Sequence, residues 1–85
     1  MGNTWYENLT EGEQFIFMWQ YGMLGDFKTA LIGAIMVADE HNLQRLRRGF
    51  PTEVKSYLLY INVEGWWKEV QDKANRVNKE LKEEK

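Results

Sequence analysis

Apolar residues recur at helical spacing along nearly the whole chain, and this pattern constrains the fold more than any other feature. In the last third, Trp66, Val70, Ala74, Val77 and Leu81 are spaced four, four, three and four residues apart. Residues at these intervals share one face of an α-helix, whereas a half-buried strand alternates every second residue. The sequence therefore predicts an all-α fold, a compact bundle of four to five short helices.

Two helices are expected in the first half of the chain. Thr10 to Glu13 reads T-E-G-E, a capping box that predicts a helix over about residues 11–23. Asp26 is expected to cap a second helix, over residues 27–38. Apolar side chains occupy most of the circumference of this second helix, so we expect it to be nearly buried and central.

A polar interruption, Asp39-Glu40-His41-Asn42, follows the second helix. It is compatible with two interpretations: the helix bends here, or Asn42 caps a short third helix over residues 43–48. Gly49 is expected to end that segment, and Pro51 prevents its continuation, because proline lacks the amide hydrogen that a helix interior needs.

A fourth helix is expected after a cap at Thr52. Residues 57–63 are also rich in β-forming side chains, but no second candidate strand exists to pair with them, so a helix is preferred. The final helix follows Gly65. The 85 residues are expected to form a single domain, with residues 1–9 as an N-terminal arm and residues 79–85 as a polar tail, both frayed.

Composition excludes several classes of protein. The chain has no cysteine and one histidine, which excludes disulfides and any Cys- or His-rich metal site. Its longest apolar run, from Ala30 to Ala38, is too short for a membrane span, which needs roughly twenty residues. His41 lacks an oriented partner, and the capping box accounts for Glu13. We therefore expect a cytoplasmic protein that is not an enzyme and has no cofactor, metal or membrane partner.

A basic segment is the best candidate for a ligand site. Residues 42–55 carry four cations against a single carboxylate, although the whole chain has a net charge of −2 and is not expected to bind duplex nucleic acid. Arginine forks bind phosphate and aromatic rings stack on bases. The alternative is a solvated helix end whose cations face the C-terminal dipole. The candidate ligand-binding residues are Arg45, Arg48, Phe50, Lys55 and Tyr57.

The pair Trp66-Trp67 is a candidate interface. Neighbouring residues on a helix point about 100° apart, so a single core face cannot take both rings. One is expected inside, and the other at a groove or subunit contact, where tryptophan is enriched. Twelve aromatic rings are also many for a core of this size, so we expect a homo-oligomer.

Three segments resemble a known group of proteins. They are F-x-x-W-x-Y-x-x-x-G-D-F-K-T-A-L from Phe15, A-D-E-x-N-L-x-R-L-x-x-G-F-P-x-E-V from Ala38 and G-W-W-x-E-V from Gly65. Together they resemble small uncharacterised helical proteins encoded by tailed phages and prophages, over roughly residues 5–75. The resemblance carries over no catalytic residues.

The resemblance implies a phage accessory protein that acts in the bacterial cytoplasm. The leading expectation is a non-enzymatic binding protein, such as an anti-defence factor that sequesters an anionic nucleotide signal or occludes a host protein. The alternative is a structural or assembly accessory protein of the virion.

Overall fold

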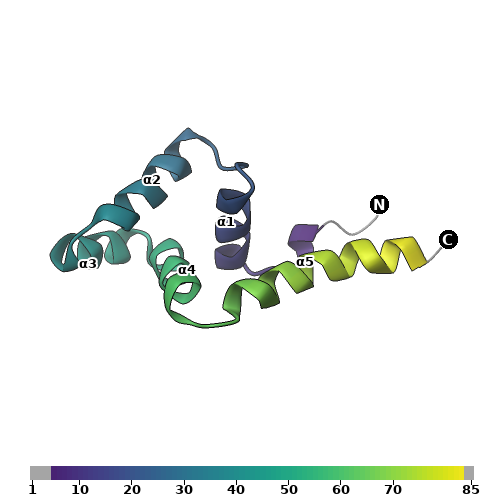
Figure 1. The fold of residues 1–85 in the computed structure, drawn as a ribbon. Helices are drawn as coiled ribbons and strands as arrows, with labels where there is room; N and C mark the ends of the chain where they lie inside the picture. Colours follow the sequence, from purple (N-terminus) through teal and green to yellow (C-terminus); the bar gives the residue numbers. More distant parts are fainter. Residues whose placement is uncertain (1–4, 84–85) are drawn as a thin grey trace.

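The computed structural model describes the backbone of residues 5–83 and the side chains of residues 7–75. Within these residues it contains helices and no strand, which confirms the all-α prediction (Figure 1). A short 3-10 helix, η1 (Trp5–Asn8), precedes five α-helices: α1 (Glu11–Gln20), α2 (Asp26–Val37), α3 (Glu40–Gly49), α4 (Pro51–Asn62) and α5 (Trp66–Glu83). None of the described helices is long and apolar enough to cross a membrane.

The capping box at the start of α1 is confirmed. Thr10 Oγ1 accepts a hydrogen bond from the Glu13 N–H (3.2 Å), and the Thr10 N–H donates to Glu13 Oε1 (2.9 Å). The predicted end of this helix was wrong, because α1 stops at Gln20. Gly22 adopts a left-handed conformation (φ 67°), and the Met23 N–H then bonds to the Met18 carbonyl at 2.7 Å, closing the helix end.

Helix α2 differs from the prediction in its cap and in its burial. Gly25, and not Asp26, is the N-cap, and no side chain caps this helix. Leu31, Ile32 and Ile35 are buried, as a central helix requires. The opposite face is exposed, so the expectation of a nearly buried helix was wrong. Its most exposed large side chains are Phe27 (64% exposed), Met36 (51%) and Val37 (84%).

Helix α3 is a separate helix, so the interpretation of a bent second helix was wrong. It begins earlier than predicted, because Asp39 is its cap: Asp39 Oδ1 accepts a hydrogen bond from the Asn42 N–H at 2.8 Å. Asn42 therefore lies inside the helix. Gly49 is its last residue, and its final turn carries Arg47 and Arg48, which interact favourably with the helix dipole.

The segment that resembled a strand is helical in α4, as predicted. The predicted cap at Thr52 was wrong: Pro51 occupies the first turn and Phe50 is the N-cap. Proline suits this position because its missing amide hydrogen is not needed there. Gly65, in the left-handed conformation (φ 85°), then turns the chain into α5.

Helix α5 holds the two ends of the described chain together. It packs along η1, and Asn8 Nδ2 donates a hydrogen bond to the Lys73 carbonyl at 3.3 Å (Figure 1). Leu9, in the predicted N-terminal arm, is buried. The helical backbone continues to Glu83, through most of the predicted polar tail, while residues 84–85 lie outside the described part of the chain.

The core consists of two clusters that share α4. One contains Phe15 and Ile16 of α1 with Ile32 of α2. The other contains Leu31, Ile35 and Val54, and α3 covers it with partly buried leucines. Tyr57 contacts both clusters, so α4 is the element around which the other helices pack.

Candidate functional site

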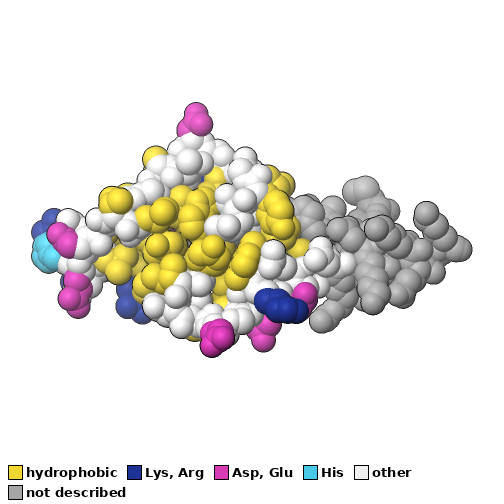
Figure 2. Space-filling view, viewed as in Figure 1, with side chains coloured by type: hydrophobic (Ala, Val, Ile, Leu, Met, Phe, Trp, Pro, Cys, Tyr) yellow, Lys and Arg dark blue, Asp and Glu magenta, His cyan; other side chains and the backbone are white. Residues whose placement is uncertain are grey.

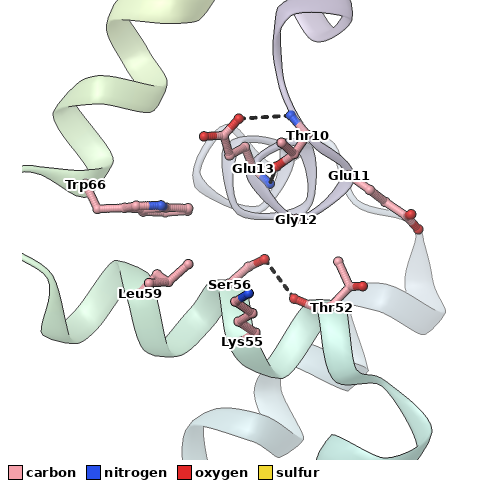
Figure 3. Close-up of a pocket in the computed structure, with 9 residues that line it drawn as sticks. All are labelled: Thr10, Glu11, Gly12, Glu13, Thr52, Lys55, Ser56, Leu59 and Trp66. Carbon is pink, nitrogen blue, oxygen red and sulfur yellow. Dashed lines mark hydrogen bonds between the residues drawn. The ribbon is translucent and has the colours of Figure 1, made fainter.

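A pocket of about 440 Å³ lies between the beginning of α1, the middle of α4 and the first residue of α5 (Figure 3). Figure 3 shows the Trp66 ring lying across its side and the α4 side chains facing the first turn of α1. We call this space the Trp66 pocket. Its lining residues are Thr10, Glu11, Gly12, Glu13, Thr52, Lys55, Ser56, Leu59 and Trp66.

The floor of the Trp66 pocket is a close contact between two small residues. A Cβ atom added to Gly12 would lie on Ser56 Oγ and 3.2 Å from Ser56 Cβ, so only glycine lets α1 approach α4 this closely. Ser56 is buried, and its hydroxyl donates a hydrogen bond to the Thr52 carbonyl at 2.7 Å. This contact fixes the position of the α1 N-terminus on α4.

Glu13 is a buried carboxylate at the wall of this pocket. Burial alone would raise its pKa, but the hydrogen bond and charge of Lys73 and the hydrogen bonds with Thr10 outweigh burial, so the pKa of Glu13 is lowered from its usual 4.5. Lys73 Nζ lies 2.8 Å from Glu13 Oε2. The carboxylate therefore joins the first turn of α1 to α5.

The hydroxyls of the Trp66 pocket make hydrogen bonds within the chain. Thr10 Oγ1 accepts from the Glu13 N–H, and the Ser56 hydroxyl donates to the Thr52 carbonyl. His41 is exposed on α3 and does not line this pocket. In the part of the chain that the structure describes, no three His, Cys, Asp or Glu side chains come together to hold a metal ion.

The five predicted ligand-binding residues do not share one pocket. Lys55 lines the Trp66 pocket, whereas Arg45 lines a different hollow. Phe50 packs against Phe27, with ring centroids 5.8 Å apart, and Tyr57 packs edge-on against Trp19, at 6.1 Å. Arg48 is exposed in the last turn of α3. The structure thus gives each of these five residues different surroundings.

The hollow that contains Arg45 is also about 440 Å³ in volume and lies between the end of α2 and α3. We call it the Arg45 pocket. Four of its lining side chains are apolar, and Arg45 and Asp39 supply opposite charges. Its lining residues are Ala34, Val37, Ala38, Asp39, Asn42, Arg45 and Leu46.

Trp66 and Trp67 are both half-buried, and Trp67 belongs to a connected set of rings from three helices. We call this set the aromatic network; its members are Tyr21, Phe17, Trp67, Tyr60, Trp19 and Tyr57, in order of contact. Neighbouring centroids are 4.6 to 6.1 Å apart, the range of favourable ring contacts. The sequence indicated the two tryptophans but not this connection, because the contacts join residues far apart in the chain.

Hydrophobic side chains gather on the face of the molecule that Figure 2 shows. Figure 2 shows them as a continuous patch over the region where α1, α2 and α4 lie in Figure 1, with charged side chains around its edge. An apolar centre inside a polar rim is the usual anatomy of a protein–protein interface.

Comparison of the chain with protein-family models, with curated proteins and with solved structures finds no match.

Proposed function

We propose that this chain is a non-enzymatic binding protein that docks on another protein through the exposed edge of the aromatic network. The proposal rests on the exposure and packing of the six rings. Five of them are half-buried and in contact with neighbouring rings, and Tyr21, at the end of the network, is exposed. Rings already held in place lose little conformational freedom on binding, which makes them effective anchors.

The geometry supports protein docking better than capture of a nucleotide. A nucleotide pocket needs arginine forks and a stacking ring around one space. Here Arg45 and Lys55 line different pockets, and the Tyr57 ring is packed against Trp19. The aromatic network and the apolar patch of Figure 2 offer instead a broad surface, which suits a folded partner.

The proposed setting comes from the resemblance to small proteins of tailed phages and prophages. In that setting the chain acts in the bacterial cytoplasm as an accessory protein that occludes a host protein, such as a component of a defence system. A role in assembly of the virion is the alternative, and it would use the same surface on a phage protein.

Photo-crosslinking in phage-infected cells tests the docking surface. A photoreactive phenylalanine analogue at Tyr21, an exposed position in contact with Phe17, is expected to give one discrete adduct with a host protein. The matched control carries the same analogue at Gln44, an exposed position on α3, and is expected to give no such adduct. Equal crosslinking from both positions, or crosslinking from Gln44 alone, would contradict the proposed docking surface. An adduct between the Tyr21 position and a virion protein would favour the assembly role.

A binding measurement with the identified partner completes the test. Tyr21→Ala is expected to weaken binding at least about tenfold, as loss of an interface tyrosine commonly does. Val63→Ala, which shortens another exposed apolar side chain outside the aromatic network, is expected to leave affinity unchanged. Because both side chains are exposed, both variants are expected to stay folded, with Tyr21→Ala losing at most the contact of its ring with Phe17.

A further inference from the structure

We propose that the exposed face of α2 binds a second copy of this chain, in a two-fold symmetric dimer whose two α2 helices run antiparallel. This inference goes beyond the proposed function, because it concerns α2 and requires no foreign partner.

The α2 face has the pattern of a helix-packing seam. Phe27, Ala30, Ala34 and Val37 are spaced three, four and three residues apart, and all four are exposed. Residues at this spacing form one stripe along a helix. We call it the α2 seam. A surface helix in a monomer normally presents polar side chains on its outer face, but this stripe presents none.

The two ends of the α2 seam are complementary in shape. Phe27 protrudes at one end, with 64% of its surface exposed. The Arg45 pocket, at the other end, is a hollow partly lined by Ala34, Val37 and Leu46. Ten residues of helix, about 15 Å, separate the protruding ring from the hollow.

An antiparallel two-fold arrangement matches each protrusion to a hollow. A two-fold axis near the middle of α2 places Phe27 against the partner's Val37 and the partner's Arg45 pocket. By symmetry, the Phe27 ring of the partner subunit meets Val37 and the Arg45 pocket of the first subunit. Ala30 then lies opposite the partner's Ala34, and these small side chains let two helices approach to the usual 8–10 Å. A parallel arrangement would instead oppose ring to ring and hollow to hollow.

The charges at the two ends agree with this arrangement. Asp26 precedes Phe27 at the start of the seam, and Arg45 lies at the hollow. In the antiparallel dimer each Asp26 approaches Arg45 of the partner subunit. Among the described residues, neither side chain makes an ion pair within its own chain. Arg45 thus offers the opposite charge to Asp26 of the partner subunit, while Asp39, which also lines the hollow, accepts the Asn42 N–H as the cap of α3.

Sedimentation velocity on purified protein at micromolar concentration tests the dimer. The wild type is expected to sediment at about twice the 10.1 kDa mass of the chain. Val37→Lys is expected to be monomeric and folded, because Val37 is 84% exposed and a lysine at a helix C-terminus is favourable. The matched control, Val63→Lys, changes an exposed valine outside α2 and is expected to remain dimeric.

Cysteine pairing tests the direction of the helices, since the chain contains no other cysteine. We expect oxidation of a mixture of Ala30→Cys and affinity-tagged Ala34→Cys to give mixed disulfide dimers faster than either variant gives self-linked dimers.

A monomeric wild type, or a Val63→Lys variant that dissociates like Val37→Lys, would overturn the α2 interface. Faster self-linking of each variant would overturn the antiparallel arrangement. None of these measurements involves a host protein, so their failure leaves the Tyr21 experiment to be judged separately.

Discussion

Glu13 joins two helices that are distant in the sequence: its Oε1 accepts the Thr10 N–H at 2.9 Å, and its Oε2 lies 2.8 Å from Lys73 Nζ. The first contact caps α1, and the second attaches α5 to it. A single carboxylate therefore contributes to local helix stability and to the packing of the chain ends.

Replacement of this carboxylate is expected to destabilise the protein. Glu13→Gln keeps the size of the side chain but removes its charge, and it should lower the free energy of unfolding by about 1–3 kcal/mol, the usual range for hydrogen bonds to a charged group. Urea denaturation at neutral pH measures this. Glu11→Gln, at an exposed position in the same turn, is the control and should change stability by less than about 0.5 kcal/mol.

The lowered pKa of Glu13 predicts a loss of stability in acid. A carboxylate whose pKa is lower in the folded than in the unfolded chain stabilises the fold above the unfolded value, here 4.5. That contribution is lost as the pH falls below 4.5 and through the folded pKa. Urea denaturation at successive pH values should therefore show a smaller loss between neutral pH and pH 3 in Glu13→Gln than in the wild type. Equal losses would show that Glu13 does not contribute to the acid response.

Gly12 is expected to be intolerant of even one added carbon. Alanine favours an exposed helix by about 1 kcal/mol over glycine, but here its Cβ would overlap Ser56 Oγ. We expect Gly12→Ala to destabilise the protein by about 1–3 kcal/mol, as overpacking does. Adding Ser56→Ala should recover part of this loss by removing the overlapping oxygen. If the double variant is as unstable as the sum of the single changes, the contact is not the cause.

Burial of one face of α2 predicts the effect of shortening its side chains. Leu31→Ala and Ile35→Ala are each expected to cost about 2–5 kcal/mol, the range for large-to-small changes in a core. Ile61→Ala removes a comparable side chain that is half-exposed on α4 and should cost much less. Thermal melts that change by a similar amount in all three variants would contradict the assignment of the core.

Titration calorimetry with a cyclic dinucleotide tests the basic segment directly. We expect no saturable heat of binding, because Arg45 and Lys55 line separate pockets and the ring of Phe50 is packed against Phe27. The Arg45→Ala/Arg48→Ala double variant should therefore behave like the wild type. Saturable binding that disappears in the double variant would restore the hypothesis of an anionic ligand.

Local signals in the sequence predicted the helices well and their ends less well. The capping box at Thr10 depends on residues within one turn, so the sequence was sufficient to predict it. Asp39, Asn42 and Thr52 can all cap helices, and the choice among them depends on which backbone amides the neighbouring helices leave free. Sequence alone did not resolve these choices: Asp39 caps α3 in place of Asn42, and Phe50 precedes α4 in place of Thr52.

Tertiary contacts were harder to predict. A helix that is apolar on all sides, as α2 nearly is, can be either central or exposed to a partner, and periodicity does not distinguish these cases. The separation of Arg45 from Lys55 likewise follows from the directions of α3 and α4, which sequence spacing does not give. The glycine at position 12 was the one overlooked local signal, because a glycine within a helix often marks a close approach.

The attachment of α5 to α1 has a consequence for synthesis of the chain. Lys73, which completes the contact with Glu13, is synthesised only after the whole of α1 to α4. Until α5 is complete it cannot pack on η1 and α1, and its residues Val70 and Ala74 cannot be buried. The nascent protein thus passes through a stage with exposed apolar surface, which is the kind of state that chaperones bind and that proteases cleave. Shortening the chain before residue 70 would make that stage permanent.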